Sequence, residues 1–391
     1  MILRRLSWGA RDWRCVAFAT LALAGCSSPI CDGPAPDASG ARLAAGVVFS
    51  CFIRDSGQVV CWGLNIDGQL GDGSRMIRDT PNPVHGLDDA VGVAAGKYHA
   101  CARRSSGDVV CWGQLHDGRG VQLTPVPIPA LFQAVELTAA YGTCARCGNG
   151  TIGCFGFNLW GEIGDGTYEK RPTPVRVEKI NDAVQVAMGT DSVHACARHA
   201  GGAVSCWGWN DYGQLGDSTY THRPVPGLVP GLEQIVDVSV GGFNSCAVQA
   251  SGSVWCWGSN VLGILGDGST DFWRATPGPV AGIGDAVDVS VGSAHVCALR
   301  RGGKVSCWGS NAWGEIGDGH YTGMGADRRR PKPVEVVGLE DAVEVAAGTT
   351  HTCAVRKTGQ VVCWGGNLWG ERGDGSAKTV LPMPAPVVGL P

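Results

Sequence analysis

The sequence predicts an all-β fold, a seven-bladed β-propeller, and three observations lead to that prediction. Glycine accounts for 61 of the 391 residues, and each glycine inside a helix would cost up to about 1 kcal/mol, so long helices are excluded. Fourteen cysteines form seven equally spaced pairs. A unit of about 50 residues that holds several short strands recurs along the chain, which is typical of propeller blades.

The N-terminal segment is interpreted as a lipoprotein signal peptide. Arginines up to Arg14 precede an apolar run, Val16 to Ala24, that is too short to span a bilayer. The tetrapeptide Leu-Ala-Gly-Cys that ends at Cys26 resembles the bacterial lipoprotein signal, in which the cysteine is acylated. The alternative is an ordinary secretory signal followed by a chance cysteine. We therefore expect a signal peptide over residues 1–25, lipidation at Cys26, a flexible tether over 26–40 and a propeller over 41–391.

The paired cysteines predict one disulfide in each unit. Nine residues separate the two members of every pair, and a glycine stands six residues after the first member, as in a hairpin that places the two cysteines opposite each other. A zinc site is the weaker alternative, because zinc ligands cluster more tightly and the chain carries an export signal. Cys31 and Cys147 remain over, and a bridge between them would pin the tether. The predicted pairs are Cys51 with Cys61, Cys101 with Cys111, Cys144 with Cys154, Cys196 with Cys206, Cys246 with Cys256, Cys297 with Cys307 and Cys353 with Cys363.

Each unit contains at least three strand candidates. A Pro-x-Pro-Val run belongs at a blade edge because proline cannot donate a ladder hydrogen bond. An alternating strand follows, and the third strand reads Gly-x-Val-x-Cys-Trp-Gly. The first unit lacks a Pro-rich strand before it and the chain ends with one, so we expect the C-terminal strand to complete the first blade. The tryptophans of the third strand are the predicted core, namely Trp62, Trp112, Trp207, Trp257, Trp308 and Trp364.

The recurring strings Gly-x-x-His-x-Cys-Ala, Val-x-Cys-Trp-Gly-x-Asn and Gly-x-Leu-Gly-Asp-Gly resemble the regulator of chromosome condensation repeat over residues 41–391. The resemblance implies a seven-bladed propeller, and in the founding member of the family the propeller promotes nucleotide exchange on a small nuclear GTPase and docks on chromatin. The paired cysteines depart from the family pattern and look like an exported bacterial branch. An exported protein meets neither partner, so the resemblance supports the fold more than that activity.

Two candidate metal sites are interpreted as structural, and no metal or cofactor is predicted. Histidine recurs two residues before the first cysteine in four units, where a ring N–H is expected to reach a backbone carbonyl of the same blade. The Gly-Asp-Gly turns resemble fragments of calcium loops but lack alternating oxygen ligands, so the aspartate is expected to cap the turn. The four histidines are His99, His194, His295 and His351.

One face of the ring is predicted to bind a partner. In the Asn-x-x-Gly loop the residue before the glycine varies while its frame does not, which predicts a solvent-facing side chain. The loops after Gly-Asp-Gly vary likewise and combine aromatics with arginines, the mixture found at protein interface hot spots and suited to stacking on sugars. The alternative is that these aromatics pack between neighbouring loops. The predicted partner-binding residues are Trp160, Tyr212, Trp273, Trp313, Trp369, Arg274 and Arg329.

We expect a lipid-anchored, monomeric scaffold in the bacterial cell envelope, at the outer membrane or the cell surface, that binds an envelope protein or polysaccharide without catalysis. The net charge of −4 argues against a nucleic-acid partner. No nucleophile elbow, phosphate loop or His-Glu-x-x-His string occurs. The alternatives are an exchange-type regulator, by resemblance, and a hydrolase or lyase that acts on glycans with carboxylates brought together by the ring.

Overall fold

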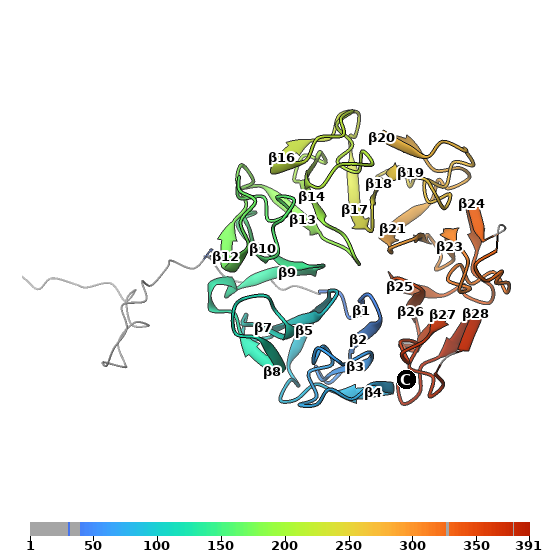
Figure 1. Ribbon diagram of the computed structural model, residues 1–391. Coiled ribbons are helices and arrows are strands. Elements are labelled where there is room, and N and C mark those ends of the chain that lie inside the picture. Colours follow the sequence, from blue (N-terminus) through green and yellow to red (C-terminus); the bar gives the residue numbers. More distant parts are fainter. Residues whose placement is uncertain (1–29, 32–39, 326–327, 378) are drawn as a thin grey trace, which may run out of the picture.

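The predicted seven-bladed propeller is confirmed. The computed structural model describes residues 30–31, 40–325, 328–377 and 379–391, which form seven four-stranded antiparallel sheets around a central axis (Figure 1). The predicted signal peptide and most of the predicted tether, including Cys26, lie outside the described residues. Among the described residues, no helix is long and apolar enough to cross a membrane.

Four consecutive strands make each blade, and the first strand of each lies innermost (Figure 1). Blade 1 comprises β1 (Leu43–Ala45), β2 (Phe49–Ile53), β3 (Val59–Gly63) and β4 (Arg78–Pro83); blade 2, β5 (Ala90–Ala95), β6 (His99–Arg104), β7 (Val109–Gln114) and β8 (Val121–Pro127); blade 3, β9 (Ala134–Ala139), β10 (Gly142–Cys147), β11 (Ile152–Gly156) and β12 (Arg171–Arg176). Blade 4 comprises β13 (Ala183–Ala187), β14 (His194–His199), β15 (Val204–Gly208) and β16 (Arg223–Leu228); blade 5, β17 (Ile235–Gly241), β18 (Asn244–Gln249), β19 (Val254–Ser259) and β20 (Trp273–Pro279). Blade 6 comprises β21 (Ala286–Val291), β22 (His295–Arg300), β23 (Val305–Ser310) and β24 (Arg329–Glu335); blade 7, β25 (Ala342–Ala347), β26 (His351–Arg356), β27 (Val361–Asn367) and β28 (Thr379–Pro386). A 3-10 helix, η1 (Pro129–Leu131), links blades 2 and 3.

The expectation that the C-terminal strand completes the first blade is wrong. Strand β28 pairs with β27 in its own blade, and blade 1 already has β4 as its fourth strand. The Pro-rich strand does lie at the blade edge, as expected, but it follows the Cys-Trp-Gly strand of its own unit rather than leading the next one. The reason is local: the loop after the third strand turns the chain directly back onto that strand.

The seven predicted intra-blade disulfides are present. In each blade the two cysteines lie directly opposite each other on the second and third strands, with Cα atoms 4.0–4.1 Å apart. From blade 1 to blade 7, the bridges join Cys51 to Cys61, Cys101 to Cys111, Cys144 to Cys154, Cys196 to Cys206, Cys246 to Cys256, Cys297 to Cys307 and Cys353 to Cys363. All fourteen of these cysteines are therefore disulfide-bonded, which leaves none of them as a zinc ligand.

An eighth disulfide joins the two remaining cysteines of the described residues, Cys31 and Cys147. It connects a residue before the first blade to the end of β10, across a sequence separation of 116 residues. Next to it, the backbone N–H of Ile30 donates to the carbonyl of Ala130 at 3.1 Å. The described end of the N-terminal segment is therefore fixed to blade 3.

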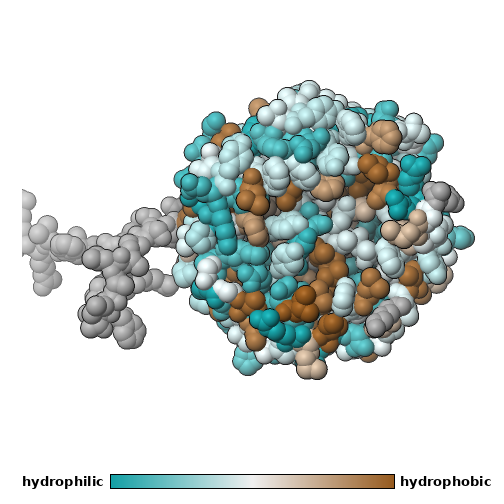
Figure 2. Space-filling view, viewed as in Figure 1, coloured by the Kyte–Doolittle hydropathy of each residue, from teal (hydrophilic) through white to brown (hydrophobic). Residues whose placement is uncertain are grey.

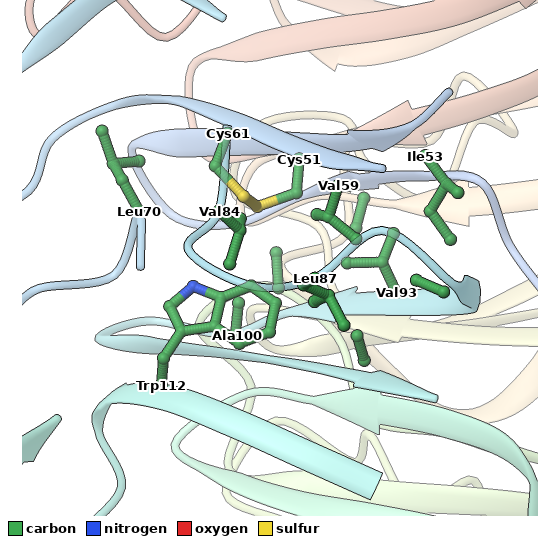
Figure 3. Packing of buried hydrophobic residues seen from close by; sticks show 14 of the residues in the cluster. Cys51, Ile53, Val59, Cys61, Leu70, Val84, Leu87, Val93, Ala100 and Trp112 are labelled. Carbon is green, nitrogen blue, oxygen red and sulfur yellow. A yellow bond between two sulfur atoms is a disulfide. The ribbon is translucent and has the colours of Figure 1, made fainter. Parts of the chain in front are cut away.

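The six recurring tryptophans of the third strands are fully buried, as predicted, and they join neighbouring blades. Each indole N–H donates to a loop carbonyl of the preceding blade at 2.8–3.0 Å; Trp112, for example, bonds the Gln69 carbonyl. Figure 3 shows Trp112 beside Leu70, Val84 and the Cys51–Cys61 disulfide of blade 1. Blade 3 has Phe155 at this position, and the shortened loop of blade 2 lacks the Gly-Asp-Gly turn. The interface between blades 2 and 3 thus lacks the indole donor that the other six interfaces share.

The four histidines also bridge blades, so the expectation that each bonds its own blade is wrong. Each Nε2 lies 2.6–2.9 Å from a Ser or Thr hydroxyl of the following blade, because the ring points across the interface. The partner hydroxyls belong to Thr143, Ser245, Thr352 and Ser50, in chain order of the histidines. Where the histidine position holds Phe49, Gly142 or Asn244, the next blade has Ala100, Ala195 or Val296 instead of a hydroxyl. A histidine in one blade therefore always faces a Ser or Thr hydroxyl in the next blade, and where the histidine is missing the hydroxyl is missing too.

Ring closure between blades 7 and 1 uses these same devices. The Ser50 hydroxyl contacts His351 at 2.9 Å and donates to the Glu371 carbonyl at 3.1 Å, which also accepts the Trp62 indole N–H. Deeper in the ring, a Glu344 carboxylate oxygen accepts the backbone N–H groups of Arg42 and Leu43. Noncovalent contacts between whole blades therefore close the ring. On the face seen in Figure 2, hydrophobic residues gather near the middle of the ring and hydrophilic residues cover much of its rim.

Candidate functional site

One face of the ring carries all the long loops. In every blade the turn between the first two strands and the loop between the last two strands lie on the same side, because the four strands are antiparallel and consecutive. The short turns between the second and third strands lie on the other side. We call the first side the loop face.

Each long loop is built on a buried asparagine. In blade 1, Asn65 accepts the Leu70 backbone N–H at 3.0 Å and donates to the carbonyl of Met76 at 3.1 Å. Asp72 of the Gly-Asp-Gly turn accepts the backbone N–H and hydroxyl of Ser74 and pairs with Arg78. Burial raises the pKa of Asp72, but the Ser74 and Arg78 hydrogen bonds outweigh it and hold that pKa below its ordinary value. The aspartate therefore caps the turn, as the sequence predicts.

A buried carboxylate or carboxamide positions the variable residue of the loop. Glu162 accepts the Trp160 backbone N–H at 2.9 Å, and Glu371 accepts that of Trp369 at 2.7 Å. Burial raises the pKa of both glutamates, against the opposing effect of these backbone hydrogen bonds. The backbone of the variable residue is thereby fixed while its side chain points outward. Glu315, Gln69 and Gln214 do the same for Trp313, Asp67 and Tyr212.

Nine aromatic residues of blades 2 to 5 gather on the loop face in two groups, which we call the aromatic tract. In the first group His116 lies edge-on to Phe157, with ring centroids 4.2 Å apart. In the second, Trp160 stacks on Trp209 at 5.6 Å, and Trp209 meets Phe243 edge-on at 4.9 Å. All nine are exposed or half-buried. The tract consists of Tyr98, His116, Tyr141 and Phe157, and of Trp160, Trp209, Tyr212, His222 and Phe243.

Charged groups at the tract are held in place. The Lys97 ammonium lies 4.5 Å from the Tyr141 ring centroid and 2.8 Å from an Asp191 carboxylate oxygen. Burial and, to a smaller extent, nearby Lys170 lower the pKa of His116 to about 4, against the opposing effect of Asp117, so the ring is neutral at pH 7. The His116 Nε2 and the Trp209 indole N–H are buried without a hydrogen-bond partner among the described residues. At this end of the tract Lys97 is therefore paired and His116 uncharged.

The structure brings only part of the predicted binding set together. Trp160 and Tyr212 belong to the aromatic tract, whereas Trp273, 49% exposed, forms a separate pair with Phe272. Trp313 is half-buried and Trp369 is 41% exposed on the same face, and neither makes a ring contact within the described part of the chain.

The two predicted arginines have different surroundings. Arg274 pairs with Asp267 at 2.5 Å and also donates to the Cys256 carbonyl, so it supports its own loop. Arg329 is exposed at the start of β24. Sequence reasoning missed Tyr98, Tyr141 and Phe243, which lie in the turns between first and second strands, each one residue before the start of the second strand.

The central channel offers the other concentration of polar groups. It is lined by the innermost strands of all seven blades and encloses about 270 Å³. Burial and the neighbouring Asp237 carboxylate raise the pKa of Asp288 well above its ordinary value. Asp237 itself accepts the Gln185 amide and the Val289 backbone N–H, so it ties adjacent blades together. Within the described residues, no group of three or more His, Cys, Asp or Glu side chains is arranged to hold a metal ion.

Fold and surface together define a disulfide-bonded propeller with one aromatic face, of the class that serves as a regulator or binding scaffold. The chain belongs to the family of the regulator of chromosome condensation (RCC1) repeat, whose models match residues 56–103, 201–248 and 251–299, and 41–69, 90–119, 183–214, 235–264, 286–314 and 342–368.

Three similar proteins illustrate the range of this family. The ultraviolet-B receptor UVR8 of Arabidopsis thaliana is 30% identical over 352 residues, which are 86% of this chain and 79% of that protein. The human E3 ubiquitin-protein ligase HERC2 is 27% identical over 236 residues, which are 56% of this chain and only 5% of that protein. The structure of Prp20p from Saccharomyces cerevisiae, studied for its binding to Gsp1p and histones, has a TM-score of 0.74 at 21% identity and covers 86% of this chain and 87% of that one.

Proposed function

We propose that this protein is a lipid-anchored, extracytoplasmic scaffold that binds a protein partner on its loop face, through the aromatic tract. The observation that carries the proposal is the concentration of nine aromatic side chains, none of them fully buried, on one face of a rigid ring. Aromatic side chains supply large contact areas at low entropic cost and dominate interface hot spots.

The disulfides support an oxidising compartment. Eight disulfides are present among the described residues, and such density is typical of exported proteins. That compartment disfavours the exchange-type alternative, which requires a GTPase. Protein binding by a related propeller, Prp20p, favours a protein over other ligands. A polysaccharide of the cell envelope is the second candidate, because the stacked Trp160–Trp209 pair presents flat rings on which sugars can stack.

Affinity capture with matched variants tests the binding face. The native protein is purified from membranes with its bound partner, and capture is compared with that by Trp160→Ala/Trp209→Ala and by Trp313→Ala/Trp369→Ala. We expect the tract variant to weaken binding by at least about 2 kcal/mol. The second variant tests how far the contact extends around the face, to residues that the sequence also predicts as binding residues. Arg301→Ala, in a turn of the opposite face, is the control.

Unchanged capture by a folded Trp160→Ala/Trp209→Ala variant would contradict the proposed face. Lipid anchoring is tested separately, since Cys26→Ser removes the proposed acyl acceptor. That variant should leave the membrane fraction, because stable anchoring needs two or more acyl chains. Retention of Cys26→Ser in the membrane fraction would refute the anchor and leave the binding face untouched.

A further inference from the structure

A pocket of about 320 Å³ lies at the end of the aromatic tract, between blades 4 and 6. Tyr212 and Phe243 form one wall, with their ring centroids 5.0 Å apart and their planes inclined by 32°. Val261 and Leu262, from the long loop of blade 5, line the pocket as well, and Val261 is 50% exposed. The volume is at the lower end of the range for ligand sites, which suits one large side chain rather than an extended molecule.

The pocket also contains an arginine, Arg328, whose charge no described residue compensates. In other long loops the arginine nearest the fourth strand pairs with the Gly-Asp-Gly aspartate, as Arg78 does with Asp72. Blade 6 has three arginines in a row, and Arg330 takes that structural role by pairing with Asp318 at 2.8 Å. Arg328 lines the pocket, and its guanidinium forms no ion pair within the described ranges of the chain.

We propose that this pocket receives the anchor of a protein partner: a large apolar side chain with a carboxylate beside it in the same peptide. This inference rests on the proposed function and specifies the chemistry of the partner. The rings of Tyr212 and Phe243 bury the apolar side chain, and the Arg328 guanidinium binds the carboxylate in the two-pronged geometry that lysine cannot provide. The carboxylate comes from an aspartate, a glutamate or the C-terminus of the partner chain.

The test uses defined probes and a matched pair of arginine variants. A phage-displayed library of random dodecapeptides is selected on the immobilised, oxidised protein, and enriched sequences are synthesised with a fluorescent label. We expect enriched peptides to place an aromatic or large aliphatic residue within two positions of an Asp or Glu. Fluorescence anisotropy should show at least tenfold weaker binding to Arg328→Gln and a less than twofold change for Arg75→Gln, an exposed arginine of the same face in blade 1.

Peptide variants identify the source of the carboxylate. Replacing the internal Asp or Glu by its amide, or amidating the C-terminus, should abolish the dependence on Arg328 in one of the two cases. Enrichment without acidic residues, or equal binding by Arg328→Gln, would overturn the proposal. No enriched peptide, together with Arg328-dependent binding of polygalacturonate, would also overturn it and assign the pocket to an acidic glycan. If the tract variant loses the native partner and Arg328→Gln does not, the pocket proposal fails while the proposed function stands.

Discussion

Removal of the Thr352 hydroxyl should destabilise the interface between blades 6 and 7, because it leaves the Nε2–H group of His295 without an acceptor. The Thr352 hydroxyl lies 2.8 Å from His295 Nε2 and donates to the Glu315 carbonyl at 2.9 Å. Because its single hydrogen goes to the carbonyl, the Nε2 of the neutral imidazole must carry a hydrogen and donate to the hydroxyl. Thr352→Val preserves the shape of the side chain and leaves that buried N–H without an acceptor, while Glu315 keeps its bond from the Trp364 indole. A buried donor left unsatisfied costs about 1–3 kcal/mol.

The chain itself contains the compensating change, because Asn244 and Val296 replace the histidine and hydroxyl at the interface between blades 5 and 6. His295→Asn combined with Thr352→Val removes the orphaned donor, so the double variant should lose about 1–2 kcal/mol less than the sum of the single losses. Guanidinium chloride titrations of the oxidised protein at pH 7 measure the four free energies of unfolding. Val296→Thr is the reverse isosteric control and should change stability by less than about 1 kcal/mol. Strictly additive losses, or no loss for Thr352→Val, would refute the reasoning.

Further predictions concern the core, the pH dependence and the disulfides. Phe155→Trp should lower the melting temperature in a thermal scan, because Phe155 is fully buried and a larger ring overpacks a filled interface; a gain in stability would contradict this. Burial lowers the pKa of His295 to about 3, so the unfolded chain binds a proton that the folded protein does not, and stability falls as pH drops below about 6.5. His295→Asn should therefore reduce the slope of unfolding free energy against pH between about 6.5 and 4, and an unchanged slope would exclude this origin. Cys297→Ser with Cys307→Ser should cost about 2–3 kcal/mol in a denaturant titration by the loop-entropy estimate, and non-reducing peptide maps of the parent that join cysteines of different blades would contradict the pairing.

The blade count was predictable because the cysteine and glycine positions define one hairpin per unit, and hairpins are local structures. The closure of the ring was not predictable from the same signals. A Pro-rich strand between two units can pair with the strand before it or with the blade after it, and the number of strands is equal in both arrangements. The long loop between β27 and β28 leads the chain back onto β27, which decides between the two arrangements.

The binding residues were predictable at the loop position that varies from unit to unit while the residues around it stay the same. Trp160 faces outward because Glu162 fixes its backbone, and the sequence shows a Glu or Gln at this position in every long loop except the shortened one of blade 2 and that of blade 5, which has Ile264 there. Sequence reasoning missed Phe243 and Tyr98 because they lie in the turns between first and second strands rather than in the long loops. They reach the tract only when neighbouring blades pack side by side. An available signal was their shared position, three residues before the first cysteine of their units.

Footprinting of the native complex tests the central claim, that a partner covers the aromatic tract, most directly. Hydroxyl radicals modify exposed aromatic side chains, so the protein is labelled with and without its captured partner and the rates are compared by peptide mass spectrometry. We predict protection of Trp160, 37% exposed, and of Phe243, 38% exposed, while residues in the turns of the opposite face react at unchanged rates. Protection confined to those opposite turns, with Trp160 and Phe243 reacting as in the free protein, would contradict the account.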